Sequence, residues 1–139
     1  EYLEEHRDEY YDRLLAVSSE GDWTGWVAFF LRALTSQAES NIEKANSILK
    51  LHARLRDWIV ETTHSQYGVR ALDWMFMRPI FQPPDFIDAA EIPGATARRI
   101  VRVLRDNGML REIRPAPERR PATLVFSELL NIAEGKEAF

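Results

Sequence analysis

The chain has 139 residues, 45% of them hydrophobic, and a formal net charge of −4 at pH 7. This length and apolar content suit one ordinary domain or two very small ones and exclude a disordered linker, while the absence of cysteine excludes disulfides, thiol nucleophiles and cysteine zinc sites. No apolar run approaches the ~20 residues that span a bilayer and no signal-peptide pattern is present, so we expect a cytoplasmic protein with no membrane partner.

Two helices are predicted for the first half of the chain. Apolar residues at helical spacing predict a helix over Tyr2–Val17, which Ser18–Gly21 ends. Asp22 is a suitable N-cap for a second helix, and no proline interrupts the sequence up to Thr63. We therefore predict one long helix there. A helix of this length must pack on a second element, a partner chain or a missing domain. Its apolar seam either joins two copies of the chain or packs on the missing core or on the helix at Tyr2–Val17, and it consists of Leu31, Leu34, Ile42, Leu49, Leu55 and Ile59.

The second half of the chain is predicted to consist of short helices and strands separated by turns. Predicted helices, in chain order, cover residues 69–77, 85–90, 95–107 and 128–133, and predicted strands cover residues 109–114 and 123–126. Within the first strand, Leu110 and Ile113 are expected to face inward. Ile92–Gly94 forms the turn before the third helix, and the proline- and arginine-rich stretch 115–121 joins the strands.

This order is that of a winged helix-turn-helix, in which three helices are followed by a β-hairpin. We therefore predict a mainly α fold: a helical arm with a long helix, followed by a winged helix-turn-helix domain. The expected domains are residues 1–64 and 65–139. The sequence begins with Glu1 rather than Met, and we expect it to be part of a longer protein.

Charge is distributed unevenly along the chain. Residues 1–63 contain twelve acidic and seven basic side chains, whereas residues 94–120 contain eight arginines and three acidic side chains. A local basic patch suggests a polyanion or an acidic protein as partner, although it can also be a solvated face that binds nothing. For double-stranded DNA, the third helix would enter the major groove. The candidate nucleic-acid-binding residues are Thr96, Arg98, Arg99, Arg102, Arg119 and Arg120.

Two stretches resemble Fic proteins. Residues 6–38 resemble the region just after the Fic catalytic core, through Arg7, Tyr10, Tyr11, Gly21, Asp22, Trp23, Trp26, Phe29 and Phe30. Residues 72–130 resemble the winged-helix domain that closes many Fic proteins, through Phe76 before Pro79, Thr96-Ala97, Leu104 and Gly108-Met109-Leu110. The likeness covers nearly the whole chain.

Fic proteins transfer AMP from ATP to a hydroxyl side chain of a target protein, and the resemblance implies this adenylyltransferase activity (AMPylation), with ATP and a divalent metal, for the missing Fic core. The family's catalytic histidine, phenylalanine and glycine-asparagine-glycine-arginine loop have no counterpart here, since His6, His52 and His64 lie in other contexts. We therefore expect no catalytic, cofactor-binding or metal-binding residue in this chain, and no enzyme activity of the chain alone.

Two functions follow as expectations. The first is the non-catalytic C-terminal region of a Fic-type AMP-transferase, acting as a DNA-binding or a regulatory, protein-docking module. Its partners would be double-stranded DNA, a protein target or its own Fic core, and a second copy bound through the long helix to form a dimer. The alternative is a stand-alone winged-helix transcription regulator with a helical dimerisation arm. The docking hypothesis stays open because winged domains also bind proteins.

Overall fold

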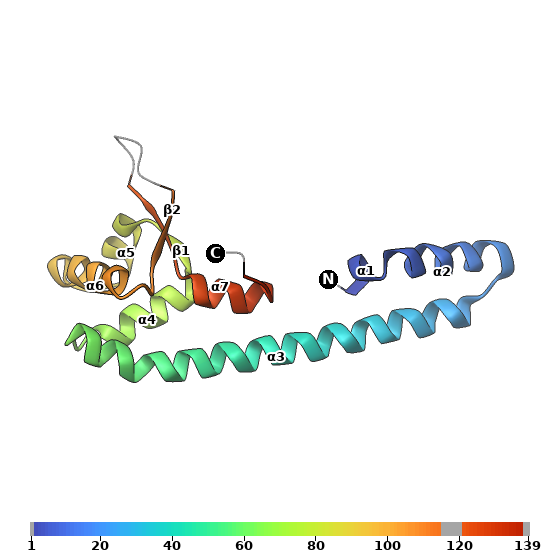
Figure 1. Ribbon diagram of the computed structural model, residues 1–139, viewed down its shortest axis with the longest axis horizontal. Helices are drawn as coiled ribbons and strands as arrows, with labels where there is room; N and C mark the ends of the chain where they lie inside the picture. Colours follow the sequence, from blue (N-terminus) through green and yellow to red (C-terminus); the bar gives the residue numbers. More distant parts are fainter. Residues whose placement is uncertain (1, 115–120, 138–139) are drawn as a thin grey trace. The chain divides into compact units, whose positions relative to one another are not determined.

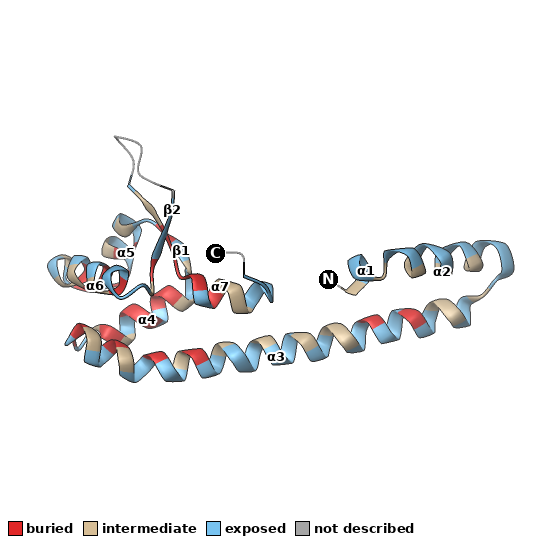
Figure 2. Cartoon of the chain, viewed as in Figure 1, coloured by how far each residue is buried: buried red, intermediate tan, exposed pale blue. Residues whose placement is uncertain are grey.

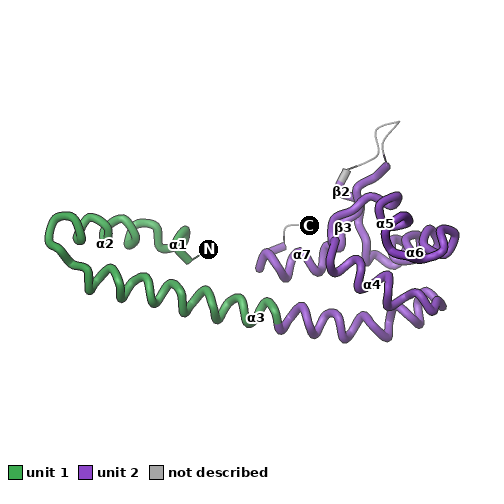
Figure 3. The backbone as a smooth tube through the Cα atoms, turned by 180° about the vertical axis from the view of Figure 1, so that it is seen from behind, with its two compact units in different colours: residues 1–45 green, residues 46–139 purple. Residues whose placement is uncertain are grey.

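The computed structural model describes residues 2–114 and 121–137, which form two compact units (Figure 3). Unit 1 is Glu1–Ala45 and unit 2 is Asn46–Phe139. The long helix α3 (Trp23–Thr63) is continuous, as predicted, and contributes its first part to unit 1 and its remainder to unit 2 (Figure 1). The predicted domains, 1–64 and 65–139, divide the chain at the end of α3, and that division stays a prediction.

Unit 1 consists of α1 (Tyr2–Glu5), α2 (Arg7–Glu20) and the first part of α3. The single helix predicted for Tyr2–Val17 is wrong at both ends of α2. His6 interrupts it, with its ring stacked on Tyr2 and its Nδ1 within 3.0 Å of the Tyr2 carbonyl oxygen. The helix then continues to Glu20, because the hydroxyls of Ser18 and Ser19 bond to carbonyls one turn back instead of ending it.

The connection between α2 and α3 follows from two residues. Gly21 has a φ of 71°, a left-handed conformation that glycine adopts without steric cost, and its N–H donates to the Val17 carbonyl. Asp22 is the predicted N-cap of α3: its Oδ1 accepts the Gly25 N–H at 2.9 Å. The chain therefore reverses within a few residues, and α2 and the start of α3 pack together.

Unit 1 leaves much of its apolar surface uncovered (Figure 2). Tyr10 packs edge-on against Trp26 at 5.5 Å between ring centroids, but Phe29 and Ala33 are the only buried residues among those described in 2–45. The side chains that stay exposed are large and apolar: Leu3, Tyr11, Leu14, Leu15, Trp23, Val27, Phe30, Leu31, Leu34 and Ile42. The described part of unit 1 therefore has little buried core of its own.

Unit 2 contains the end of α3 and the winged helix-turn-helix. Its further elements, in chain order, are α4 (Gly68–Met77), β1 (Ile80–Phe81), α5 (Pro83–Ala89), α6 (Gly94–Asp106), β2 (Arg111–Arg114), β3 (Thr123–Val125) and α7 (Ser127–Glu134). The strands form an antiparallel sheet in the order β1-β3-β2. The predicted mainly α fold with a winged helix-turn-helix is confirmed. The two residues of β1 are too few to leave a sequence pattern, so this strand was not predicted.

One core holds unit 2 together. Its largest fully buried side chains come from six different elements or their ends: Ile59, Leu72, Met75, Phe86, Ile100, Leu104, Leu124 and Phe126. Leu55 and Ile59 of the predicted seam belong to this core, whereas Leu31, Leu34, Ile42 and Leu49 stay exposed. Leu110 is buried as expected, but Ile113 is 41% exposed. Successive side chains of a strand point to opposite faces, so a residue three positions after the buried Leu110 faces outward. The pairing of β2 with β3 also shifts register between Glu112 and Arg114.

Candidate nucleic-acid interface

Helix α6 is the second helix of the helix-turn-helix and is strongly amphipathic. Its buried face consists of the four residues predicted for it, Ala97, Ile100, Val101 and Leu104, each at most 6% exposed. This face packs against α5 and α4. Burial of apolar side chains at spacings of three and four fixes the rotation of α6 about its axis, and therefore decides which side chains face outward.

Three arginines follow one another along the outward side of α6. Arg98, Arg102 and Arg105, here called the arginine stripe, are spaced by four and three residues and so share one helix face. All three are exposed. They border a groove of about 630 Å³, whose apolar floor includes Ile87 of α5 and Leu110.

The members of the arginine stripe differ in what they contact. Arg105 Nη2 lies 3.1 Å from Glu112 Oε2 of β2, and the two side chains keep 45% and 32% of their accessible surface. Such solvent-exposed pairs stabilise a fold by only about 0.2–1 kcal/mol. Arg98 and Arg102 have no hydrogen-bond or ion-pair partner among the residues that the structure describes. Two cations of the stripe are therefore available to an anionic ligand.

Arg99 lies on a different side of α6. Its Nη1 donates to the backbone carbonyl of Thr63, the last residue of α3, at 2.6 Å. The last turn of α3 contains no basic residue of its own, so Arg99 supplies the cation that stabilises this helix end. Thr96 is also half-buried and outside the stripe. The structure thus brings Arg98 and Arg102 together with Arg105, which the candidate set omitted, and separates Arg99 and Thr96 from them.

Arg119 and Arg120, the two remaining candidates, lie outside the described residues. Sequence periodicity alone was enough to find Arg105, because it continues the spacing of Arg98 and Arg102. The partners of Arg99 and Arg105 were beyond that signal, since Thr63 and Glu112 are 36 and 7 residues away along the chain.

We expect Arg99→Ala to destabilise unit 2 by about 1–3 kcal/mol, because the buried Thr63 carbonyl loses a charge-assisted hydrogen bond. Thermal unfolding followed by circular dichroism measures the loss. Arg99→Lys keeps the cation and should lose less. Unchanged thermal stability of Arg99→Ala would show that the contact with Thr63 is not stabilising.

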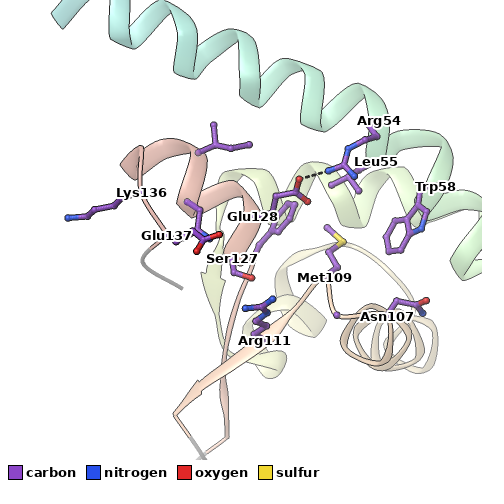
Figure 4. Close-up of a pocket in the computed structure, with 14 residues that line it drawn as sticks. Arg54, Leu55, Trp58, Asn107, Met109, Arg111, Ser127, Glu128, Lys136 and Glu137 are labelled. Carbon is purple, nitrogen blue, oxygen red and sulfur yellow. Dashed lines mark hydrogen bonds and ion pairs between the residues drawn. The ribbon is translucent and has the colours of Figure 1, made fainter.

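A second groove, of about 900 Å³, lies elsewhere in unit 2 (Figure 4). Arg54 of α3 and Glu128 of α7 form an ion pair across it, Trp58 and Met109 line it, and Arg111 points into it from β2. Both charges of the ion pair are more than half exposed, and polar and apolar groups alternate around the groove. The sequence alone did not predict this groove, because its lining residues come from three separate stretches, 54–58, 107–111 and 126–137.

His52 is packed and hydrogen-bonded in unit 2. His52 Nε2 lies 2.7 Å from Asp73 Oδ1, and its ring packs edge-on against Phe76. This is the packed, hydrogen-bonded role that its position on the apolar side of α3 suggests. Within residues 2–114 and 121–137, no three His, Asp or Glu side chains are grouped so that they could hold a metal ion.

A scan against protein-family models finds no match for this chain. The resemblance to Fic proteins therefore stays a prediction. None of the helices in the described part of the chain is long and apolar enough to cross a membrane.

Proposed function

We propose that unit 2 binds double-stranded DNA, with α6 in the major groove and with Arg98 and Arg102 of the arginine stripe on phosphates or guanine edges. The observation that carries the proposal is the pair Arg98 and Arg102, which are exposed on the outward face of the second helix of a helix-turn-helix and have no partner in the described chain. In that fold this face is the one that meets DNA. Arginine suits the role because its planar fork bonds phosphate or the guanine O6/N7 edge through two N–H groups.

Docking of an acidic protein is the second candidate. The observation that favours it is the apolar floor beside the arginine stripe, which includes Ile87 and Leu110. An acidic peptide with apolar side chains would fill such a groove, whereas a DNA phosphate gains nothing from it. The DNA proposal takes precedence because it also uses the position of the stripe on the helix-turn-helix.

We propose, for the whole protein, that this chain is the non-catalytic C-terminal region of a Fic-type AMP-transferase in the cytoplasm. The exposed apolar side chains of unit 1, with Trp23 at 64% and Leu15 at 66%, support this, because closing helices of a larger core would have them covered. ATP and a divalent metal would then bind to that core. Sequencing the gene upstream of Glu1 tests the proposal: the glycine-asparagine-glycine-arginine loop should be encoded there, and its absence would favour a stand-alone regulator.

DNA binding is tested by fluorescence anisotropy of a labelled duplex titrated with the chain from 50 to 200 mM salt. We expect log K to fall linearly with log salt concentration, with a slope of about −0.9 for each phosphate that an arginine contacts. An acidic peptide with the same net charge as the duplex should compete only weakly with the duplex for the chain. If the folded chain does not bind the duplex at 50 mM salt, the arginine stripe has no role in DNA binding and the docking function takes its place.

A further inference from the structure

Glu112 pairs with Arg105, one member of the arginine stripe. Its Oε2 lies 3.1 Å from Arg105 Nη2, the distance at which arginine binds phosphate oxygens, and it reaches the arginine stripe from β2, a different element. The neighbouring members of the stripe, Arg98 and Arg102, have no such partner within the described residues. One of three equivalent cations is therefore already neutralised.

We infer that Glu112 is a specificity-determining residue: its carboxylate binds Arg105 in place of a DNA phosphate, so that Arg105 does not contact the DNA backbone. The inference rests on the proposed DNA binding of unit 2. Contacts with phosphates bind all DNA sequences alike, whereas base contacts discriminate between them. An internal carboxylate that removes one phosphate contact lowers non-specific affinity and leaves contacts with base edges untouched. As a result, contacts that depend on the DNA sequence contribute a larger share of the binding free energy.

The exposure of the ion pair supports this role. Both side chains of the pair remain in contact with water, at 45% and 32% of their surface, so the pair contributes little to the fold and its removal leaves the core intact. Residue 112 pairs through its backbone with Leu124, which holds the carboxylate in place whatever its charge. Glutamine at this position keeps the shape of the side chain and removes the charge.

The experiment compares the slope of log K against log salt concentration for duplex binding in four proteins: wild type, Glu112→Gln, Arg105→Ala, and the double variant. Glu112→Gln should steepen the slope by about 0.9 and raise affinity about eightfold at 0.1 M salt, because Arg105 gains one phosphate contact. Arg105→Ala should leave the wild-type slope unchanged, yet lower the slope of the Glu112→Gln protein by about 0.9. If Arg105→Ala changes the slope only when residue 112 is glutamine, the Glu112 carboxylate acts through Arg105.

Two control variants separate this effect from simple charge removal. Asp106→Asn removes an exposed carboxylate at the end of α6 that forms no ion pair within the described residues. Glu128→Gln, on α7, breaks the exposed ion pair with Arg54 of α3. Neither should steepen the slope. Thermal unfolding of each variant confirms that it is folded.

Three outcomes overturn the inference. If Arg105→Ala lowers the slope equally in both backgrounds, Arg105 already contacts DNA and Glu112 withholds nothing. If Asp106→Asn steepens the slope as much as Glu112→Gln, general repulsion explains the effect. Duplex binding with equal slopes in wild type and Glu112→Gln overturns this inference alone, whereas no binding by either protein overturns the proposed DNA-binding function as well.

Discussion

Replacing Arg98 and Arg102 together by alanine is expected to weaken duplex binding on the order of 50-fold at 0.1 M salt, because two lost phosphate contacts remove about 1.8 from the slope of log K against log salt concentration. Both side chains are exposed and unpartnered within the described chain, so the stability of unit 2 should not change. Anisotropy titrations of the variant and the wild type over the same salt range measure both quantities.

The matched control is Lys50→Ala/Arg56→Ala, which removes two exposed positive charges from α3. It lowers the net charge by the same amount, and we expect its slope to stay within about 0.3 of the wild-type value because these residues lie on neither α6 nor the hairpin. Equal losses in the two double variants would mean that net charge, and not the position of the arginine stripe, governs binding. Loss of affinity with an unchanged slope would instead indicate contacts with base edges.

Phe86→Ala is expected to have the largest effect on stability. Phe86 is fully buried at the centre of the unit 2 core, and its ring lies 5.1 Å from that of Trp74 and 5.9 Å from that of Phe81. Its loss leaves a cavity that should cost about 3–5 kcal/mol of unfolding free energy. That is a large fraction of the total for a domain of this size, so the melting temperature should fall by at least ~12 °C.

Near-UV circular dichroism during thermal unfolding checks this prediction, because Trp74 reports the packing around Phe86 directly. Met77→Ala is the control: it also shortens a large side chain, but Met77 is 73% exposed, and we expect its melting temperature to stay close to that of the wild type. Equal melting temperatures for Phe86→Ala and the wild type would contradict the described core. Since Phe86 anchors α5 beside α6, its loss should also weaken DNA binding.

Helix-forming patterns in this sequence were informative where they were long and regular. The absence of proline from Asp22 to Thr63 and the three-and-four spacing of apolar residues predicted α3 as one helix. The same periodicity identified the four buried residues of α6. It also predicted the sequence of helices and strands that makes the winged helix-turn-helix.

The errors arose where local hydrogen bonds or the alternation of a strand decide the outcome. The prediction that the helix ends at Ser18 and Ser19 is wrong, because their hydroxyls donate to carbonyls one turn back within the helix. The prediction that Ile113 faces inward together with Leu110 is wrong, because residues three positions apart in a strand lie on opposite faces, and Ile113 is exposed. The bonding of the serine hydroxyls leaves no pattern in the residues themselves, whereas the alternation of the strand does.

For the candidate nucleic-acid interface too, some features follow from the sequence and others from the tertiary structure. The sequence by itself determined that arginines recur along one helix and that Arg98, Arg102 and Arg105 share a face, because the angular period of a helix is a property of its own backbone. Only the tertiary structure decided which of these cations is available. Thr63 binds Arg99 and Glu112 binds Arg105 because the folded chain brings the end of α3 and strand β2 next to α6, and such contacts between elements depend on the tertiary structure.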